Sequence, residues 1–107
     1  MAKKAISKDI IRNIQKFKTV VEAAGVPVEK MILFGSYAKG TARTDSDIDV
    51  CVVSKKFGFN DVLEMQWLFK KTTDVDLRIE PYPMSPKDLK FTENPIVGEI
   101  VKWGVLV

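Results

Sequence analysis

The stretch GSYAKGTARTDSDIDV, residues 35–50, joins an apolar run to a cluster of acids and decides how the rest of the chain is interpreted. Residues Met31–Phe34 come directly before it and are typical of a buried strand that feeds a turn. Residues 47–53 have the pattern of a second strand. We therefore predict a strand, a turn with a short helical pattern, and a second strand that starts among the acids.

Asp47 and Asp49 stand two residues apart at the start of this second strand. Alternate side chains of a strand share a face, so both carboxylates face one way while Ile48 and Val50 face the other. Two carboxylates this close raise each other's pKa unless a cation lies between them, which predicts a Mg²⁺ site. The alternative is an ordinary polar turn with Asp49 solvated at a strand edge, and the acids alone do not decide between the two.

Gly35-Ser36 is a candidate phosphate-binding turn, because glycine lets the backbone approach an anion and the following N–H groups begin a helix. Ser36 can add a hydroxyl, and Lys39 or Arg43 a positive charge. A Gly-Ser turn by itself also fits a plain loop. The spacing is more specific: Gly-Ser, ten residues and Asp-x-Asp arise by chance about once in 10³ chains of this size.

The composition fits one compact domain over residues 1–107, with 46% hydrophobic residues and a net charge of +3. This charge is too mild to select a nucleic-acid partner. The chain contains one cysteine and no histidine, so zinc-ligand sets are excluded and a hard ion such as Mg²⁺ is favoured. The start has no signal-peptide core and no apolar run approaches about 18 residues, so we expect a cytoplasmic protein without a membrane segment.

The remaining elements follow from apolar spacing and capping residues. Helices are expected from the cap Ser7 to Ala24, from a capping box at Asp61–Glu64 to about Lys71 as a mostly buried helix, from Ser85-Pro86, and from Asn94-Pro95 to Gly104. Residues Asp74–Glu80 alternate apolar and polar and predict a third strand that Pro81 and Pro83 end. The order predicts an α+β fold whose mixed sheet is covered by helices on one face and open on the other.

The combination Gly35-Ser36, ten residues, Asp47-x-Asp49 resembles the signature of the nucleotidyltransferase superfamily related to DNA polymerase β. The chain length and element order resemble the minimal nucleotidyltransferase (MNT) type, which is little more than the catalytic domain. This resemblance implies the polymerase-β-like fold, a mixed sheet flanked by helices.

The resemblance also implies roles for particular residues. Two strand carboxylates of the family, matched here by Asp47 and Asp49, bind two Mg²⁺ ions, and a third acid comes from a later strand. Asp76, in Val75-Asp76-Leu77, fits that third position best, and Asp74 is the weaker candidate. All three acids, Asp47, Asp49 and Asp76, are then expected to be both catalytic residues and metal ligands.

The phosphate contacts implied by the family are Gly35 and Ser36, with ATP as the substrate. Lys39 stands where the family often has arginine. The positive charge is kept, but the paired hydrogen bonds that a guanidinium can donate to a phosphate are lost. Arg43 lies in a loop that is usually basic in the family, although a solvated surface arginine fits equally well.

The implied activity is transfer of AMP from ATP to a hydroxyl, with release of pyrophosphate. MNT domains of this size commonly pair with a HEPN-domain toxin, and the leading hypothesis is an antitoxin that modifies a tyrosine of that toxin. The second hypothesis is a non-catalytic antitoxin that masks its partner. Under either hypothesis, some aromatic residues could lie on the surface and contact the partner, or all could belong to the core: Phe57, Phe59, Trp67 and Trp103.

A third hypothesis is a nucleotidyltransferase that acts on RNA. Basic residues recur every four positions on the first predicted helix, which could follow a phosphate backbone or simply be a solvated face: Lys4, Lys8, Arg12 and Lys16.

Overall fold

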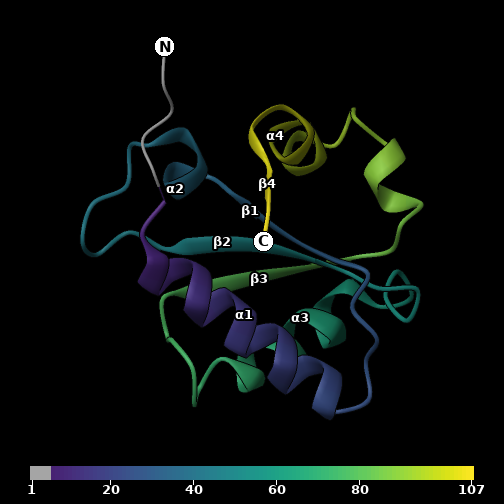
Figure 1. Cartoon of the computed structure of the whole chain (residues 1–107). Coiled ribbons are helices and arrows are strands. Elements are labelled where there is room, and N and C mark those ends of the chain that lie inside the picture. The colour runs from purple at the N-terminus through teal and green to yellow at the C-terminus, as the bar shows by residue number, and fades with distance from the viewer. Residues whose placement is uncertain (1–5) are drawn as a thin grey trace.

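The computed structural model describes residues 6–107 and contains a four-stranded mixed sheet with helices on both faces (Figure 1). The elements in chain order are α1 (Lys8–Ala23), β1 (Lys30–Phe34), α2 (Ser36–Lys39), β2 (Ile48–Val53), α3 (Asp61–Lys71), β3 (Ile79–Met84), the 3₁₀ turn η1 (Asp88–Lys90), α4 (Pro95–Trp103) and β4 (Val105–Leu106). Lys4 of the predicted basic face lies outside the described residues. Within residues 6–107, no helix is long and apolar enough to cross a membrane.

The strands lie in the order β3-β2-β1-β4, so β2 and β1 are central. β1 is antiparallel to both β2 and β4, whereas β2 and β3 are parallel. A parallel pair needs a long crossover, and α3 supplies it between β2 and β3. β4 was not predicted, because its two residues looked like an apolar tail.

The sheet is buried on both faces, so the prediction of an open face is wrong. On one face Ile48, Val50 and Val52 pack with α1 and α3; on the other, Cys51 and Val53 pack with α4 (Figure 1). The physical reason lies in β2, which is apolar at every position except the second, as expected for a strand covered on both sides.

β3 spans Ile79–Met84, so a third strand is present but its predicted bounds are wrong, because only Ile79 and Glu80 of residues 74–80 belong to it. Residues 74–78 instead form a turn, in which the Thr72 carbonyl accepts from the N–H groups of Val75 and Asp76 at 3.0 and 3.1 Å. Leu77, which the predicted alternation would place on the apolar face of the strand, is 78% exposed. The alternating pattern was therefore produced by a turn and not by a strand.

Pro81 and Pro83 lie inside β3 instead of ending it. Ile48 donates to the Arg78 carbonyl and Ser54 to the Met84 carbonyl, so the even-numbered residues of β3 turn their backbones toward β2. The two odd-numbered prolines then face the free edge, where a missing N–H costs no sheet hydrogen bond.

The helix caps follow the sequence closely. Ser7 caps α1 by accepting from Asp9 N, and Asn94 caps α4 by accepting from Ile96 N with a proline next to it. α3 differs in two ways from its prediction: Asn60 is its N-cap, and its exposed side includes Val62, Leu63 and Phe69, so it is not mostly buried.

Candidate active site

The candidate site lies where β2 and β3 begin. Asp47 is exposed just before β2, and Asp49 is the second residue of β2 and half-buried. Glu80 stands directly opposite Asp49 in the parallel register of β3, at a strand spacing of about 4.8 Å. The sequence did not predict Glu80 as a site residue, yet it is the acid that β3 brings beside Asp49.

The Asp49 carboxylate is strongly perturbed. Its pKa rises from 3.8 to about 6, first because it is desolvated, then because Glu80 and Asp47 carry like charge close by. Glu80 in turn accepts a hydrogen bond from the Tyr82 hydroxyl at 3.1 Å, and the pKa of Tyr82 is raised by burial and by Glu80. The ring of Tyr82 packs edge-on against Phe34, with centroids 5.1 Å apart, which orients this hydroxyl.

Gly35 lies directly against these acids. Its φ is +73°, a left-handed conformation that favours glycine, and a Cβ built there would overlap Asp49 Oδ2. The turn therefore needs glycine both for its backbone angle and for its approach to Asp49. Because α2 is a single turn, Gly35 and Ser36 can offer backbone N–H groups and a hydroxyl beside the acids, but little helix dipole.

Lys39 is held by α4. Its Nζ lies 3.0 Å from Glu99 Oε1 and 3.0 Å from Oε2, and 5.8 Å from the centre of the Trp103 ring. Glu99 also contributes to raising the pKa of Asp49, so it lies close enough to the site to act electrostatically. The predicted phosphate contact of Lys39 remains a prediction, and it would require Lys39 to leave or share this ion pair.

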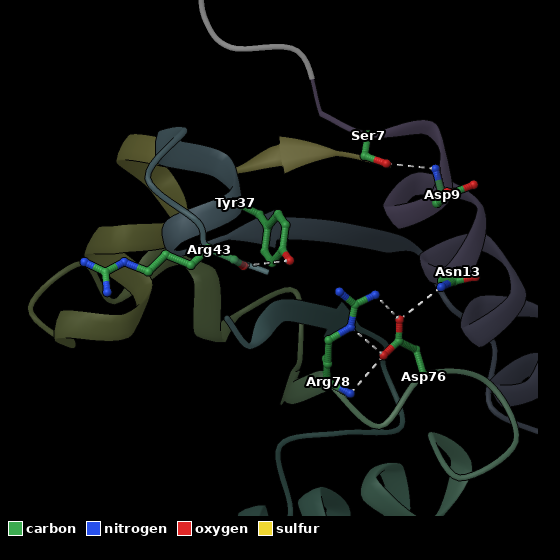
Figure 2. Close-up of polar contacts among 7 residues, drawn as sticks. All are labelled: Ser7, Asp9, Asn13, Tyr37, Arg43, Asp76 and Arg78. Atoms are coloured by element: carbon green, nitrogen blue, oxygen red, sulfur yellow. Dashed lines mark hydrogen bonds and ion pairs between the residues drawn. The ribbon is translucent and has the colours of Figure 1, made fainter. Parts of the chain in front are cut away.

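Arg43 belongs to the loop that leads to the acids, and its side chain is exposed. Its backbone N donates to Ser46 Oγ at 2.7 Å, and its carbonyl accepts from the Tyr37 hydroxyl at 3.4 Å. Figure 2 shows the guanidinium pointing away from this cluster. These contacts shape the loop, and the predicted phosphate contact of Arg43 remains a prediction.

Asp76 lies in the turn before β3, beside Asn13 of α1 (Figure 2). It accepts from Asn13 Nδ2 at 3.0 Å and from Arg78 at Nε (3.1 Å) and Nη2 (2.8 Å). The Arg78 guanidinium lowers the pKa of Asp76. Asp76 is thus engaged on the α1 side of the sheet, whereas Asp49 and Glu80 face the α4 side, so the strand argument that selected Asp76 does not hold.

A sequence signal for Glu80 did exist. Ile79-Glu80-Pro81 also places an acid between apolar residues, as Val75-Asp76-Leu77 does. If Pro81 and Pro83 are assigned to an edge strand, that strand includes Glu80, and Glu80 is then favoured over Asp76 as the third acid.

The residues around Asp49 fit a cation in charge and in donor type. Oxygen donors are the ligands that Mg²⁺ prefers, and in the described part of the chain no ion pair neutralises Asp47, Asp49 or Glu80. No group of three or more such side chains among residues 6–107 is already arranged to hold a metal ion. This holds for the predicted trio of Asp47, Asp49 and Asp76 and equally for Asp47, Asp49 and Glu80.

A family model described as a nucleotidyltransferase domain matches residues 14–101. The chain therefore belongs to the nucleotidyltransferase domain family, as the predicted resemblance indicated. No curated protein matches its sequence.

Several solved structures share the fold, among them the following three. A toxin–antitoxin with AMP-PNP matches over 88% of this chain and 71% of that chain, at 22% identity and a TM-score of 0.64. A putative nucleotidyltransferase from Sulfolobus solfataricus matches over 94% and 86%, at 23% identity and a TM-score of 0.56. A mutant of the toxin–antitoxin MntA–HpeT matches over 86% and 69%, at 18% identity and a TM-score of 0.62. These matches confirm the predicted α+β fold.

Proposed function

We propose that the chain transfers AMP from ATP to a protein hydroxyl, and that it does so as the antitoxin of a toxin–antitoxin pair. The observation that carries the proposal is the meeting of three features at one point: the Gly35 turn, the Asp47/Asp49 pair and Glu80 on the adjacent strand. We accordingly assign Glu80, in place of Asp76, as the third acid.

The chemistry requires the acceptor oxygen to bond to the α-phosphorus while the bond from that phosphorus to the β-phosphate oxygen breaks. Pyrophosphate then leaves, and the acceptor's proton passes to a carboxylate. We assign this proton to Glu80, because its carboxylate lies opposite Asp49 and is oriented by the Tyr82 hydroxyl.

Asp47, Asp49 and Glu80 would hold Mg²⁺, which when bound supplies charge neutralisation and a lower pKa for the attacking hydroxyl. The raised pKa of Asp49 supports this role, because a carboxylate crowded by like charges gains most from a cation. Gly35 and Ser36 would bind the phosphates through backbone N–H groups and the hydroxyl.

The proposed acceptor is a tyrosine of a HEPN-domain toxin. Two of the three solved structures described above are toxin–antitoxin proteins, one of them with AMP-PNP, an ATP analogue. The HEPN partner itself comes from the resemblance to MNT domains.

The test incubates the chain with Mg²⁺, ATP labelled at the α-phosphate, and the protein encoded by the neighbouring gene, followed by mapping of the labelled residue. We expect label on a tyrosine with the wild-type chain and with Asp74→Asn, an exposed acid outside the site, but none with Asp49→Asn. Full transfer by Asp49→Asn would refute the site. Tight binding with no label from any variant would instead support a masking antitoxin, and label on added RNA an RNA-directed enzyme.

A further inference from the structure

The turn that joins β2 to α3 holds a phenylalanine in solvent. Phe59 is 86% exposed, although the neighbouring Phe57 is buried in the core. The Glu64 carboxylate accepts from three successive backbone N–H groups, those of Gly58 (3.0 Å), Phe59 (3.1 Å) and Asn60 (3.2 Å). The exposure of Phe59 is thus maintained by a hydrogen-bonded turn, and no unpaired carboxylate oxygen of Glu64 is left over.

Two apolar cavities lie at this turn, and Phe57 lines both of them. One cavity of about 440 Å³ is lined by Lys55, Phe57, Gly58, Phe59, Ser85, Pro86 and Lys87. A second, of about 280 Å³, is lined by Val26, Lys56, Phe57, Leu63, Glu64 and Trp67. The first turn of α3 adds two more exposed apolar side chains, Val62 at 66% and Leu63 at 61%. Together these residues form a larger apolar surface than isolated exposed side chains would.

The charged side chains that line the larger cavity are both positive. Lys55 and Lys87 flank the larger cavity and Lys56 the smaller one. Lys55 has only a long contact to Glu29, 3.8 Å between Nζ and Oε1, with its own side chain 82% exposed. Three acids lie nearby: Glu64 lines the smaller cavity and binds the turn, Asp88 accepts from Ser85 N at 2.9 Å, and Asp61 is exposed at the start of α3. None of them lines the larger cavity, so a ligand there meets the positive charge of Lys55 and Lys87.

We propose that this Phe59 surface, made of residues 55–59, Val62, Leu63 and Lys87, binds a protein segment whose apolar side chains are flanked by Asp or Glu. The apolar side chains fill the two cavities, of which Phe59 lines the larger and Phe57 lines both, and the acids pair with the lysines at the rim. A nucleic acid fits less well, because the surface offers two apolar hollows and aliphatic side chains but only one exposed aromatic ring.

The surface is remote from the candidate active site. In Figure 1 the β2–α3 connection lies at one end of β2 and α2 at the other. Lys55 lies six positions after Asp49 and two beyond the end of β2, and six positions of extended chain span about 20 Å. A docked segment therefore leaves Asp49 and Glu80 accessible, and the proposal does not depend on the transfer reaction.

The test selects 12-residue peptides from a random displayed library on the full chain, and then measures the affinity of the enriched peptides by fluorescence anisotropy. We expect enriched peptides to combine aromatic or aliphatic residues with Asp or Glu. Phe59→Ser should weaken them about 30-fold, as for a central interface residue. Leu77→Ser is the matched control, since its side chain is also largely exposed (78%) but lies in the turn before β3, and it should bind like the wild type.

A charge-reversal variant, Lys55→Glu with Lys87→Glu, should lose acidic peptides and enrich basic ones, while thermal melts confirm that each variant is folded. Enrichment without acids, or equal binding by Phe59→Ser and Leu77→Ser, would overturn the proposal. So would Phe59-dependent self-association in sedimentation, which would assign the surface to a second copy, or Phe59-dependent binding of single-stranded RNA.

Discussion

Replacing Asp49 with Asn is expected to make the folded protein more stable at pH 7.5 while removing the proposed activity. The Asp49 carboxylate is desolvated and faces Glu80 and Asp47, which raises its pKa from 3.8 to about 6. The folded state therefore holds this proton more tightly than the unfolded state. Above pH 6 the charged carboxylate destabilises the fold, and as the pH falls from about 6 to about 4 this penalty disappears.

The size of the effect follows from the shift. A rise of about 2 pKa units corresponds to about 3 kcal/mol between the two protonation states. Because the side chain is only half-buried, solvent screening reduces the net gain to about 1 kcal/mol. For a chain of this length that is an increase in Tm of about 4 °C.

The assay is thermal unfolding in metal-free buffer at pH 7.5 and at pH 4, with Asp74→Asn as the exposed control. We expect Asp49→Asn to melt higher at pH 7.5, the gain to vanish at pH 4, and the control to match the wild type. Added Mg²⁺ should then raise the Tm of the wild type but not that of Asp49→Asn, by mass action. An unchanged or lower Tm for Asp49→Asn at pH 7.5, or a gain that persists at pH 4, would refute the electrostatic reasoning.

Three further predictions concern the site. Glu80→Gln should lower AMP transfer at least about 100-fold. Asp76→Asn should instead mainly lower the free energy of unfolding, by about 1 to 3 kcal/mol, because its contact with Arg78 is weakened. If transfer assays and thermal melts rank the two variants the other way round, Asp76 is the third acid. Gly35→Ala should abolish transfer and lower the Tm, because the new Cβ overlaps the β2 carboxylate; an active variant with wild-type Tm would contradict the close approach. Glu99→Gln should lower the KM for ATP by freeing Lys39, and an unchanged KM would exclude Lys39 from phosphate binding.

Local features of the sequence were enough to predict most of the helices and strands. The apolar run before Gly35, the caps Ser7 and Asn94, and the Asp-x-Asp strand are short-range signals, because a strand face or a helix cap depends on residues a few positions apart. The same signals failed for residues 74–84. In residues 74–78, apolar and polar residues alternate as in a strand although the chain forms a turn. The prolines of β3 are tolerated only because β3 is at the edge of the sheet.

The sequence by itself determined the class of protein and two acids of the candidate site, since the Gly-Ser turn and the Asp-x-Asp pair lie within 15 residues of each other. Only the tertiary structure decided which distant acid joins them. The parallel register of β2 and β3 brings Glu80 opposite Asp49, while Asp76 is drawn to Asn13 and Arg78 on the other side of the sheet. Strand register is a long-range property, and a shift of the strand by a few residues changes which carboxylate faces the site.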